Sequence, residues 1–297
     1  MRSVVCILLL VGAIATGCGT ASQSGSSSSV VLEPSGAIDV TDDQLDRAVD
    51  IMRARLDKLG LEDAKISRDG GRILLELPDD RRITLIPALT RPGRLEFFDL
   101  QGDLAETSMD SSGFPRPSTS SLTAAGKTVV VTCDKSERYC PGVTGEPTRT
   151  YYYLFKYDPT NKEHPIPEMT GSDLEREGTR QDFDAQTNEP VVLMSFTDSG
   201  AQKFEDITQT LVERGRSLAN QQGLSGGFGN DDANQQFAIV LDREMKSAPS
   251  VDFDDNPNGI PGKYGAQITG ISMSDARDLA LVLRTGTLPW EFRIVSE

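Results

Sequence analysis

Residues 41–60 read TDDQLDRAVDIMRARLDKLG, and this stretch predicts the first helix of the fold. Thr41 and Gln44 have the spacing of a capping box, which satisfies the free N–H groups at the start of a helix. Gly60 ends the pattern, as glycine does after many helices. The apolar positions recur every three or four residues and share one face, as Leu45, Val49, Met52, Leu56 and Leu59.

The residues on either side of this helix predict a small sheet. A hairpin is indicated by two strand-like runs, 64–68 and 72–77, that flank an Asp-Gly-Gly turn. A weaker helical run follows at 83–89, and residues 94–100 (RLEFFDL) are typical of a strand. With an initial strand within 30–40, the order is β-α-β-β-α-β, a ferredoxin-like (split βαβ) base with helices on one face of an antiparallel sheet.

Regular patterning weakens after this base. Residues 103–166 form an irregular insertion rich in Ser, Thr, Pro and Gly, with two strand-like runs at 128–133 and 150–157. The run Tyr151–Tyr153 suggests a binding surface. Because alternate side chains of a strand face opposite sides, we expect at least one of these rings to pack inward instead.

The last third of the chain predicts a second α+β unit. Thr197 caps a long helical pattern that runs to about Ala219, and a Gly-, Asn- and Ser-rich loop follows at 220–234. Ser272 opens a second helix, which Gly286 closes. The predicted strands of this part are 191–196, 237–241, 266–270 and 290–295.

The first residues of the chain indicate export. A basic start is followed by the apolar run 4–15, which is too short to span a bilayer comfortably. Ala15-Thr16-Gly17 before Cys18 is similar to the lipobox of bacterial lipoproteins, where the thiol is acylated, for example with palmitate. We therefore expect a signal peptide at 1–17, a lipid on Cys18 and a flexible linker over 18–29. The alternative is a plain secretory signal followed by an unmodified thiol.

Charge and residue usage narrow the possible functions. The net charge of −15 would repel nucleic-acid phosphates, so nucleic-acid binding is not expected. His164, the single histidine, offers a Ser-His-Asp site only a poor base, and no acidic pair stands out. Residues 252–256 begin like a calcium loop but lack its glycine and closing glutamate, which leaves weak calcium binding at most. We expect no enzyme activity, cofactor or metal site.

Two further cysteines remain after the leader and Cys18 are set aside. Cys133 and Cys140 lie seven positions apart, and two remaining cysteines in an exported chain indicate a disulfide that closes a small loop. A pair of reduced structural thiols is the alternative. Zinc is not expected, because a structural site needs four ligands.

Several ordered blocks resemble one protein family. Residues 39–60, 72–78 and 94–100, together with 190–210 (PVVLMSFTDSGAQKFEDITQT), are similar to the first periplasmic domain of SecD. SecD is the accessory subunit of the bacterial Sec protein-export translocase. The remaining similar blocks follow in the family's order, at 237–242, 247–249, 267–270 and 279–289.

The resemblance implies a base, over 30–102 and completed by 287–297, with a head inserted over 167–286. SecD continues into membrane helices that couple export to the proton-motive force, whereas this sequence stops at Glu297. The resemblance also leaves 108–162, with the cysteine pair, without a counterpart.

Together these features predict a membrane-anchored lipoprotein on the periplasmic or outer side of the cell membrane. The resemblance implies that it binds exported polypeptides, works beside Sec translocase components and assists export without catalysis. A solute- or partner-binding lipoprotein that kept the fold without an export role is the alternative, and an extracytoplasmic hydrolase is a third hypothesis.

Overall fold

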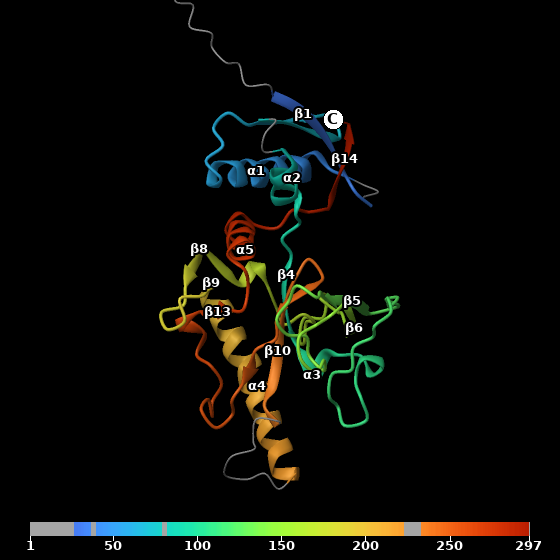
Figure 1. Cartoon of the computed structure of the whole chain (residues 1–297), viewed down its shortest axis with the longest axis vertical. Coiled ribbons are helices and arrows are strands. Elements are labelled where there is room, and N and C mark those ends of the chain that lie inside the picture. The colour runs from blue at the N-terminus through green and yellow to red at the C-terminus, as the bar shows by residue number, and fades with distance from the viewer. Residues whose placement is uncertain (1–26, 37–39, 79–81, 223–232, 297) are drawn as a thin grey trace, which may run out of the picture.

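The computed structural model describes residues 27–36, 40–78, 82–222 and 233–296. The molecule is elongated, with a small base at one end, which contains β1, α1, α2 and β14, and a larger head at the other (Figure 1). The predicted α+β fold class is confirmed. No helix in the described part of the chain is long and apolar enough to cross a membrane.

The base is built on a four-stranded antiparallel sheet in the order β14-β1-β3-β2. The strand β3 lies between β1 and β2, and α1 connects those two strands, which is the split βαβ arrangement. The bounds of the base elements are β1 Ser27–Pro34, α1 Asp42–Lys58, β2 Lys65–Asp69, β3 Arg72–Pro78, α2 Arg82–Thr90 and β14 Phe292–Ser296.

Helix α1 begins and ends where the sequence predicts. The Thr41 hydroxyl accepts the Gln44 N–H and the Gln44 side chain accepts the Thr41 N–H, so the capping box is complete. The predicted apolar face packs against the sheet, where Leu45, Met52 and Leu56 are buried. Helix α2 tolerates Pro87 in its interior.

Two predictions for the base need correction. Strand β4, Leu95–Asp99, does not join this sheet but pairs with β10 of the head, and β14 takes the place expected for it. Strand β1 begins at Ser27, so residues 27–29 of the predicted linker are paired with β3. Near the end of β14, Ile294 and Val295 are exposed, at 43% and 38%.

The chain passes between base and head twice, and the two crossings lie side by side. The Leu288 N–H donates to the Pro92 carbonyl over 2.8 Å, and the Thr287 hydroxyl donates to the Gly93 carbonyl over 3.0 Å. The final strand therefore returns to the base, as predicted, and pairs there with β1, Leu32 opposite Ile294.

The head contains a seven-stranded sheet and a three-stranded sheet. The first has the path β6-β5-β11-β10-β4-β7, with β12 beside β10, and the second has the order β13-β9-β8. The predicted strands of the last third are all present. The bounds are β5 Thr128–Cys133, β6 Tyr151–Lys156, β7 Met169–Thr170, β8 Leu174–Phe183, β9 Pro190–Phe196, β10 Gln235–Leu241, β11 Glu244–Ser247, β12 Ser250–Val251 and β13 Ala266–Ile268.

Two long helices complete the head. Helix α4, Asp198–Gln222, is capped by the Thr197 hydroxyl, which accepts the Gly200 N–H over 3.0 Å. Helix α5, Met273–Thr285, is capped by Ser272 and lies between the head sheets and the base (Figure 1). Both predicted helices are confirmed. The short helices are α3 Leu100–Asp103, η1 Glu106–Ser108, η2 Gly171–Asp173 and η4 Gly262–Tyr264.

The predicted insertion packs onto the centre of the head. Phe98 of β4 contacts apolar residues of β5 and β6 on one face of the sheet, while Phe97 joins the core under α4 on the other. Strand β4 is thus buried on both faces, which explains its uninterrupted run of buried residues. Tyr153 is fully buried, so the prediction that one ring packs inward is confirmed.

Candidate functional site

The head contains a cavity of about 530 Å³ between α4, α3 and the segment 162–168. Helix α4 contributes one face, since the lining residues Lys203, Ile207 and Thr210 recur every three or four positions. Pro165 and Ile166 supply apolar surface from the opposite wall. A cavity of this size and mixed lining is typical of a site that receives large side chains or a small ligand.

The end of β4 forms a charged wall of this head cavity. Asp99 is mostly buried and forms a two-pronged ion pair with Arg214 of α4, with Nη1 2.8 Å from Oδ2. The Arg214 Nε atom also donates to the Gln235 side chain over 2.8 Å. Such a bidentate pair has little freedom to move, so this wall is held in a fixed position.

The carboxyl groups of Asp103 and Glu168 both lie against one backbone N–H, that of Asp99. The Asp99 amide nitrogen is 3.0 Å from Asp103 Oδ2 and 3.2 Å from Glu168 Oε2. Because one N–H cannot neutralise two adjacent carboxylates, the arrangement favours a proton on one of them. Burial and the neighbouring carboxyl raise the pKa of Glu168 to about 10, and burial raises the pKa of Asp103 to about 6.

The cavity is therefore less negative at neutral pH than its residues suggest. The Glu168 carboxyl holds a proton, which it donates to the neighbouring Asp103 carboxylate, while Asp99 is balanced by Arg214. Lys203 also lines the cavity and pairs with Asp173 over 2.7 Å. A wall whose negative charge is partly neutralised, beside apolar surface, suits uncharged and apolar segments of a polypeptide.

A second notable feature is Arg55, which joins base and head. Its side chain is fully buried on α1 and has no carboxylate partner among the residues that the structure describes. Instead it donates to carbonyl oxygens of both crossings, to Arg91 over 2.6 Å and to Gly286 over 3.0 Å. It also donates to the Leu89 carbonyl over 2.8 Å and the Thr285 hydroxyl over 3.2 Å. Burial lowers the pKa of Arg55 to about 10, so it stays charged at neutral pH.

The charge of Arg55 is balanced by helix ends. Leu89 lies at the carboxyl end of α2 and Gly286 follows the last residue of α5. The carbonyl groups at helix ends carry partial negative charge. On the head side, the Asp242 carboxylate contacts the first crossing, which leads from the base to the head. It accepts hydrogen bonds from the Arg94 N–H over 2.8 Å and from Arg91 Nε over 3.0 Å. Base and head are thus joined by polar contacts to main-chain atoms.

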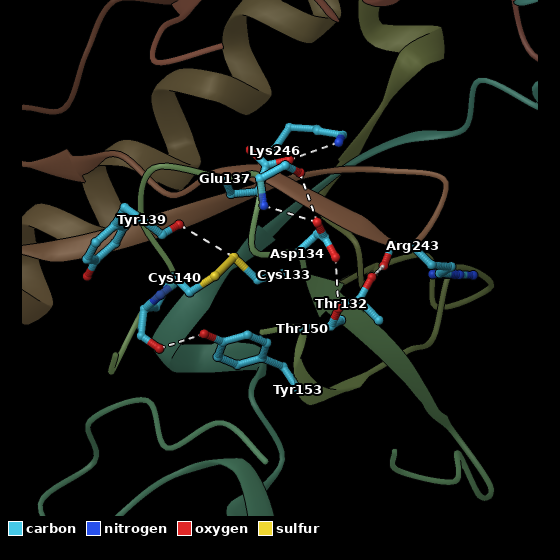
Figure 2. Close-up of a disulfide and its surroundings, with 12 residues drawn as sticks. Thr132, Cys133, Asp134, Glu137, Tyr139, Cys140, Thr150, Tyr153, Arg243 and Lys246 are labelled. Carbon is cyan, nitrogen blue, oxygen red and sulfur yellow. Dashed lines mark hydrogen bonds and ion pairs between the residues drawn. A yellow bond between two sulfur atoms is a disulfide. The ribbon is translucent and has the colours of Figure 1, made fainter. Parts of the chain in front are cut away.

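The predicted cysteine pair forms a disulfide in the insertion (Figure 2). Cys133 ends β5 and its Cα atom lies 5.9 Å from that of Cys140, with both residues buried. The enclosed loop is fixed to the head by an ion pair of 2.9 Å between Glu137 and Lys246 of β11. Beneath it, the Tyr153 hydroxyl donates to the Pro141 carbonyl over 2.6 Å, and burial raises the pKa of that tyrosine.

The other residues that the sequence suggested as possible sites lie apart from the Cys133–Cys140 disulfide. Cys18 and the rest of the predicted leader fall outside the described residues. His164 lines the head cavity. The Asp252 carboxylate accepts the N–H groups of Asp254 and Asp255, so it shapes its own turn. Within the described ranges, no group of three or more His, Cys, Asp or Glu side chains is placed to hold a metal ion.

Sequence reasoning missed the Asp99–Asp103–Glu168 cluster and the role of Arg55. Glu168 is distant from Asp99 in the sequence, so no motif joins them. One signal was present, because the apolar strand RLEFFDL contains acidic residues at 96 and 99. Acidic residues in a fully buried strand need partners, and the partners here are Arg243 for Glu96 and Arg214 for Asp99.

Comparison with known proteins agrees with this architecture. Residues 160–290 match the family model of the SecDF P1 head subdomain. The protein translocase subunit SecD of Calditerrivibrio nitroreducens is 28% identical over 262 residues, which cover 86% of this chain and 40% of that protein. SecD of Elusimicrobium minutum is 25% identical over 86% of this chain and 46% of its own length. The chain thus spans less than half of these relatives.

Solved structures show the same fold. A chain reported under "Structure and function of a membrane component SecDF that enhances protein export" aligns with a TM-score of 0.56 and 23% identity, over 91% of this chain and 98% of its own length. SecDF in its super-membrane-facing form gives the same TM-score with 22% identity, over 90% of this chain and 29% of that one. Residues 160–290 therefore match the SecDF P1 head subdomain, in a chain that is similar to SecD over most of its length.

Proposed function

We propose that this protein is an extracytoplasmic SecD-like module that binds polypeptides and assists Sec-dependent protein export. The observation that carries the proposal is the combination of base and head in one fold, which matches almost the whole of a SecDF chain described as enhancing protein export. The head cavity supplies a place for binding. Contact with Sec translocase components is part of the same proposal.

The chemistry of the head cavity supports polypeptide binding. Ile166 and Ile207 offer apolar surface, and Lys162 offers a hydrogen-bond donor. An unfolded polypeptide exposes both apolar side chains and unpaired carbonyl groups, which match these two features. The Asp99–Arg214 pair keeps the cavity wall in place while the polypeptide binds.

Hydrolysis fits this geometry less well. Glycosidases place two carboxyl groups on opposite sides of the bond that they cleave. Asp103 and Glu168 instead accept from one N–H and so lie side by side. The pair shares a proton within the wall of the cavity, and we propose no catalytic role for the chain.

The polypeptide-binding proposal can be tested by photo-crosslinking in intact cells. A photoreactive residue replaces Thr210, which lines the head cavity, and the matched control replaces Gln209, an exposed neighbour on α4 that does not line it. We expect position 210 to crosslink to many newly made exported proteins, and these products to disappear when export is blocked. Position 209 should give few.

Other outcomes would overturn the proposal. Equal patterns at 209 and 210 would exclude the cavity as the binding site. One discrete partner at position 210, independent of export, would favour the alternative of a partner-binding lipoprotein.

We further propose that Cys18 carries a lipid that anchors the chain to the membrane. The support is the sequence Ala15-Thr16-Gly17-Cys18 after an apolar leader. Cys18→Ser should move the protein from the membrane into the soluble exported fraction. Persistence of the variant in carbonate-washed membranes would show that another feature holds it there.

A further inference from the structure

A second cavity lies where the end of α1 meets the head. It has a volume of about 350 Å³ and lies between Lys58 and Leu59 of the base and helix α5 and strand β8 of the head. We call it the junction cavity. Its floor is apolar, since Leu281 and Ala280 of α5 are buried side chains that line it.

The charges around the junction cavity are opposite to those of the whole protein. Its lining contains four basic side chains, Lys58, Arg180, Arg277 and Arg284, and one acidic side chain, Asp278. The chain as a whole has a net charge of −15. In so acidic a protein, carboxylates are available to pair with most cations, so a group of cations facing one carboxylate calls for an explanation.

Three of these cations have no partner in the described part of the chain. The side chains of Lys58, Arg277 and Arg284 form no hydrogen bond or ion pair with any described residue. Arg180 pairs with Asp182 over 3.2 Å in an exposed contact, which contributes little to stability. The cavity therefore presents free positive charge.

Helix dipoles account for only part of this arrangement. Lys58 and Arg284 lie in the last turns of α1 and α5, where the carboxyl end of a helix favours cations. Arg277 lies in the second turn of α5, away from its carboxyl end, and Arg180 lies on a strand, so the helix dipole stabilises neither cation. A bound anion would compensate both of these residues.

The spacing of the cations favours an extended ligand over a small ion. Arg277 and Arg284 lie two helical turns apart, about 10 Å along the axis of α5. A single phosphate contacts both only when the two side chains bend toward each other, whereas three residues of extended polypeptide cover about 10 Å and contact both without this. Leu59 and Leu281 offer apolar contacts between the charges, which a polypeptide can use and inorganic phosphate cannot.

Strand β8 gives such a polypeptide a place to lie. Among the described strands it pairs with β9 alone, so its other side has no strand partner. Arg180 and Gln181, which line the cavity, belong to this strand, and Phe183 at its end is 47% exposed. An edge strand can accept an extended segment through main-chain hydrogen bonds.

We propose that the junction cavity binds an acidic, extended segment of a polypeptide, with carboxylates held by Lys58, Arg277 and Arg284. The inference rests on the proposed polypeptide-binding function and adds a second contact that selects by charge. It predicts that acidic stretches of an exported polypeptide bind at the junction while apolar stretches bind in the head cavity.

The test uses the full-length protein and two short fluorescent peptides. One peptide has glutamates spaced among leucine and serine, and the other has lysines at the same positions. We expect the glutamate peptide to bind at least about tenfold more tightly at low salt, and to lose most of its affinity in about 0.5 M NaCl. Fluorescence anisotropy measures both affinities.

Matched variants connect this binding to the cavity. Lys58→Gln/Arg277→Gln should weaken binding of the glutamate peptide about tenfold, because two charge-assisted contacts are lost. Lys58→Arg/Arg277→Lys should retain binding. The control, Lys135→Gln/Arg149→Gln, removes the same charge from exposed positions of the insertion and should change the affinity less than about twofold.

Several outcomes would overturn the inference. These are equal binding of the two peptides, an equal loss in the control variant, or full competition by inorganic phosphate at low concentration, which would indicate a small-anion site. Binding to anionic vesicles but not to the glutamate peptide would indicate a lipid site instead. Crosslinking at Thr210 is independent of these results, so it shows whether the proposed function fails as well.

Discussion

Arg55 on the base helix donates a hydrogen bond of 3.0 Å to the carbonyl of Gly286, a residue 231 positions later in the chain. The same guanidinium contacts the carbonyl of Leu89 at the end of α2 and that of Arg91 on the segment that leads from base to head. One buried side chain of the base thus holds both segments that lead to the head. Because the fork of an arginine is planar and rigid, this contact fixes direction as well as distance.

The first prediction concerns this residue. Arg55→Met leaves several buried carbonyl groups without a donor and should lower the free energy of unfolding by about 3 kcal/mol or more. Arg55→Lys keeps the charge but cannot reach both crossings, so its loss should be intermediate. Urea unfolding measures the loss, and amide exchange at 89–93 and 285–288 should rise in both variants.

Arg53→Met is the control for this prediction. Arg53 lies on the same helix and pairs with exposed Asp50, so its loss should stay within about 0.5 kcal/mol. Equal stability of the Arg55→Met and Arg53→Met proteins would show that Arg55 does not join base and head.

The second prediction is a pH dependence caused by Glu168. Burial and Asp103 raise the pKa of Glu168 to about 10, so the folded state binds more protons than the unfolded state above pH 4.5. Stability contributed by the protonated pair is therefore complete at low pH and falls as the pH rises toward 10. We expect a decrease on the order of 1–3 kcal/mol between pH 5 and pH 9, measured by urea unfolding.

Glu168→Gln isolates this effect. The amide keeps the shape and remains neutral, so the variant should lose much less stability over the same pH range and should be more stable than the parent protein at pH 9. A variant with the parent's pH dependence would show that the shared proton lies elsewhere.

The third prediction concerns the disulfide between Cys133 and Cys140. Intact-mass measurement of the unreduced protein should show two hydrogens fewer than the reduced chain. Reduction should cost about 2 kcal/mol, since the closed loop is short. The Glu137–Lys246 ion pair should still hold the loop near β11, so the remainder of the head should keep its protease resistance. A full count of free thiols would contradict the bond.

The fourth prediction concerns the final strand. Removing residues 290–297 deletes β14, with its main-chain pairing to β1 and the partly buried Trp290 and Phe292. We expect a loss of about 2–4 kcal/mol in the base, from two partly buried large side chains and the strand pairing. Limited proteolysis should then cut α1, while the head over 190–286 stays resistant.

A matched double variant tests which part of β14 matters. Ile294→Ser/Val295→Ser changes two exposed side chains and keeps the strand, so it should melt within a few degrees of the parent. If the truncated protein melts like the parent and α1 stays protected, the base is not closed by the C-terminal strand.

Most helices and many strands of this fold could be predicted from the sequence because they have local signals, whereas the strands β7, β8, β11 and β12 were not predicted. The capping box at Thr41, the Asp-Gly-Gly turn and the cap at Thr197 all act within a few residues. The partner of β4 could not be predicted in this way. Its apolar run indicates a strand buried on both faces but does not specify its neighbours.

The candidate site could not be predicted from the sequence either. Asp99, Asp103 and Glu168 meet only because β7 returns beside β4, which places Glu168 next to the end of that strand. In the sequence, Arg55 is one of several charged positions on an amphipathic helix. Its burial depends on the two chain crossings between base and head, which meet at its side chain. Long-range contacts of this kind leave no local periodicity.

The central claim, that this fold binds unfolded polypeptide, is tested most directly by measuring the affinity of the full-length protein for one exported protein in its unfolded and folded forms. We predict at least about tenfold tighter binding of the unfolded form, and a loss of most of that preference when Ile166→Asp places a charge in the head cavity. Equal affinity for the two forms, or a preference that Ile166→Asp leaves unchanged, would contradict the account.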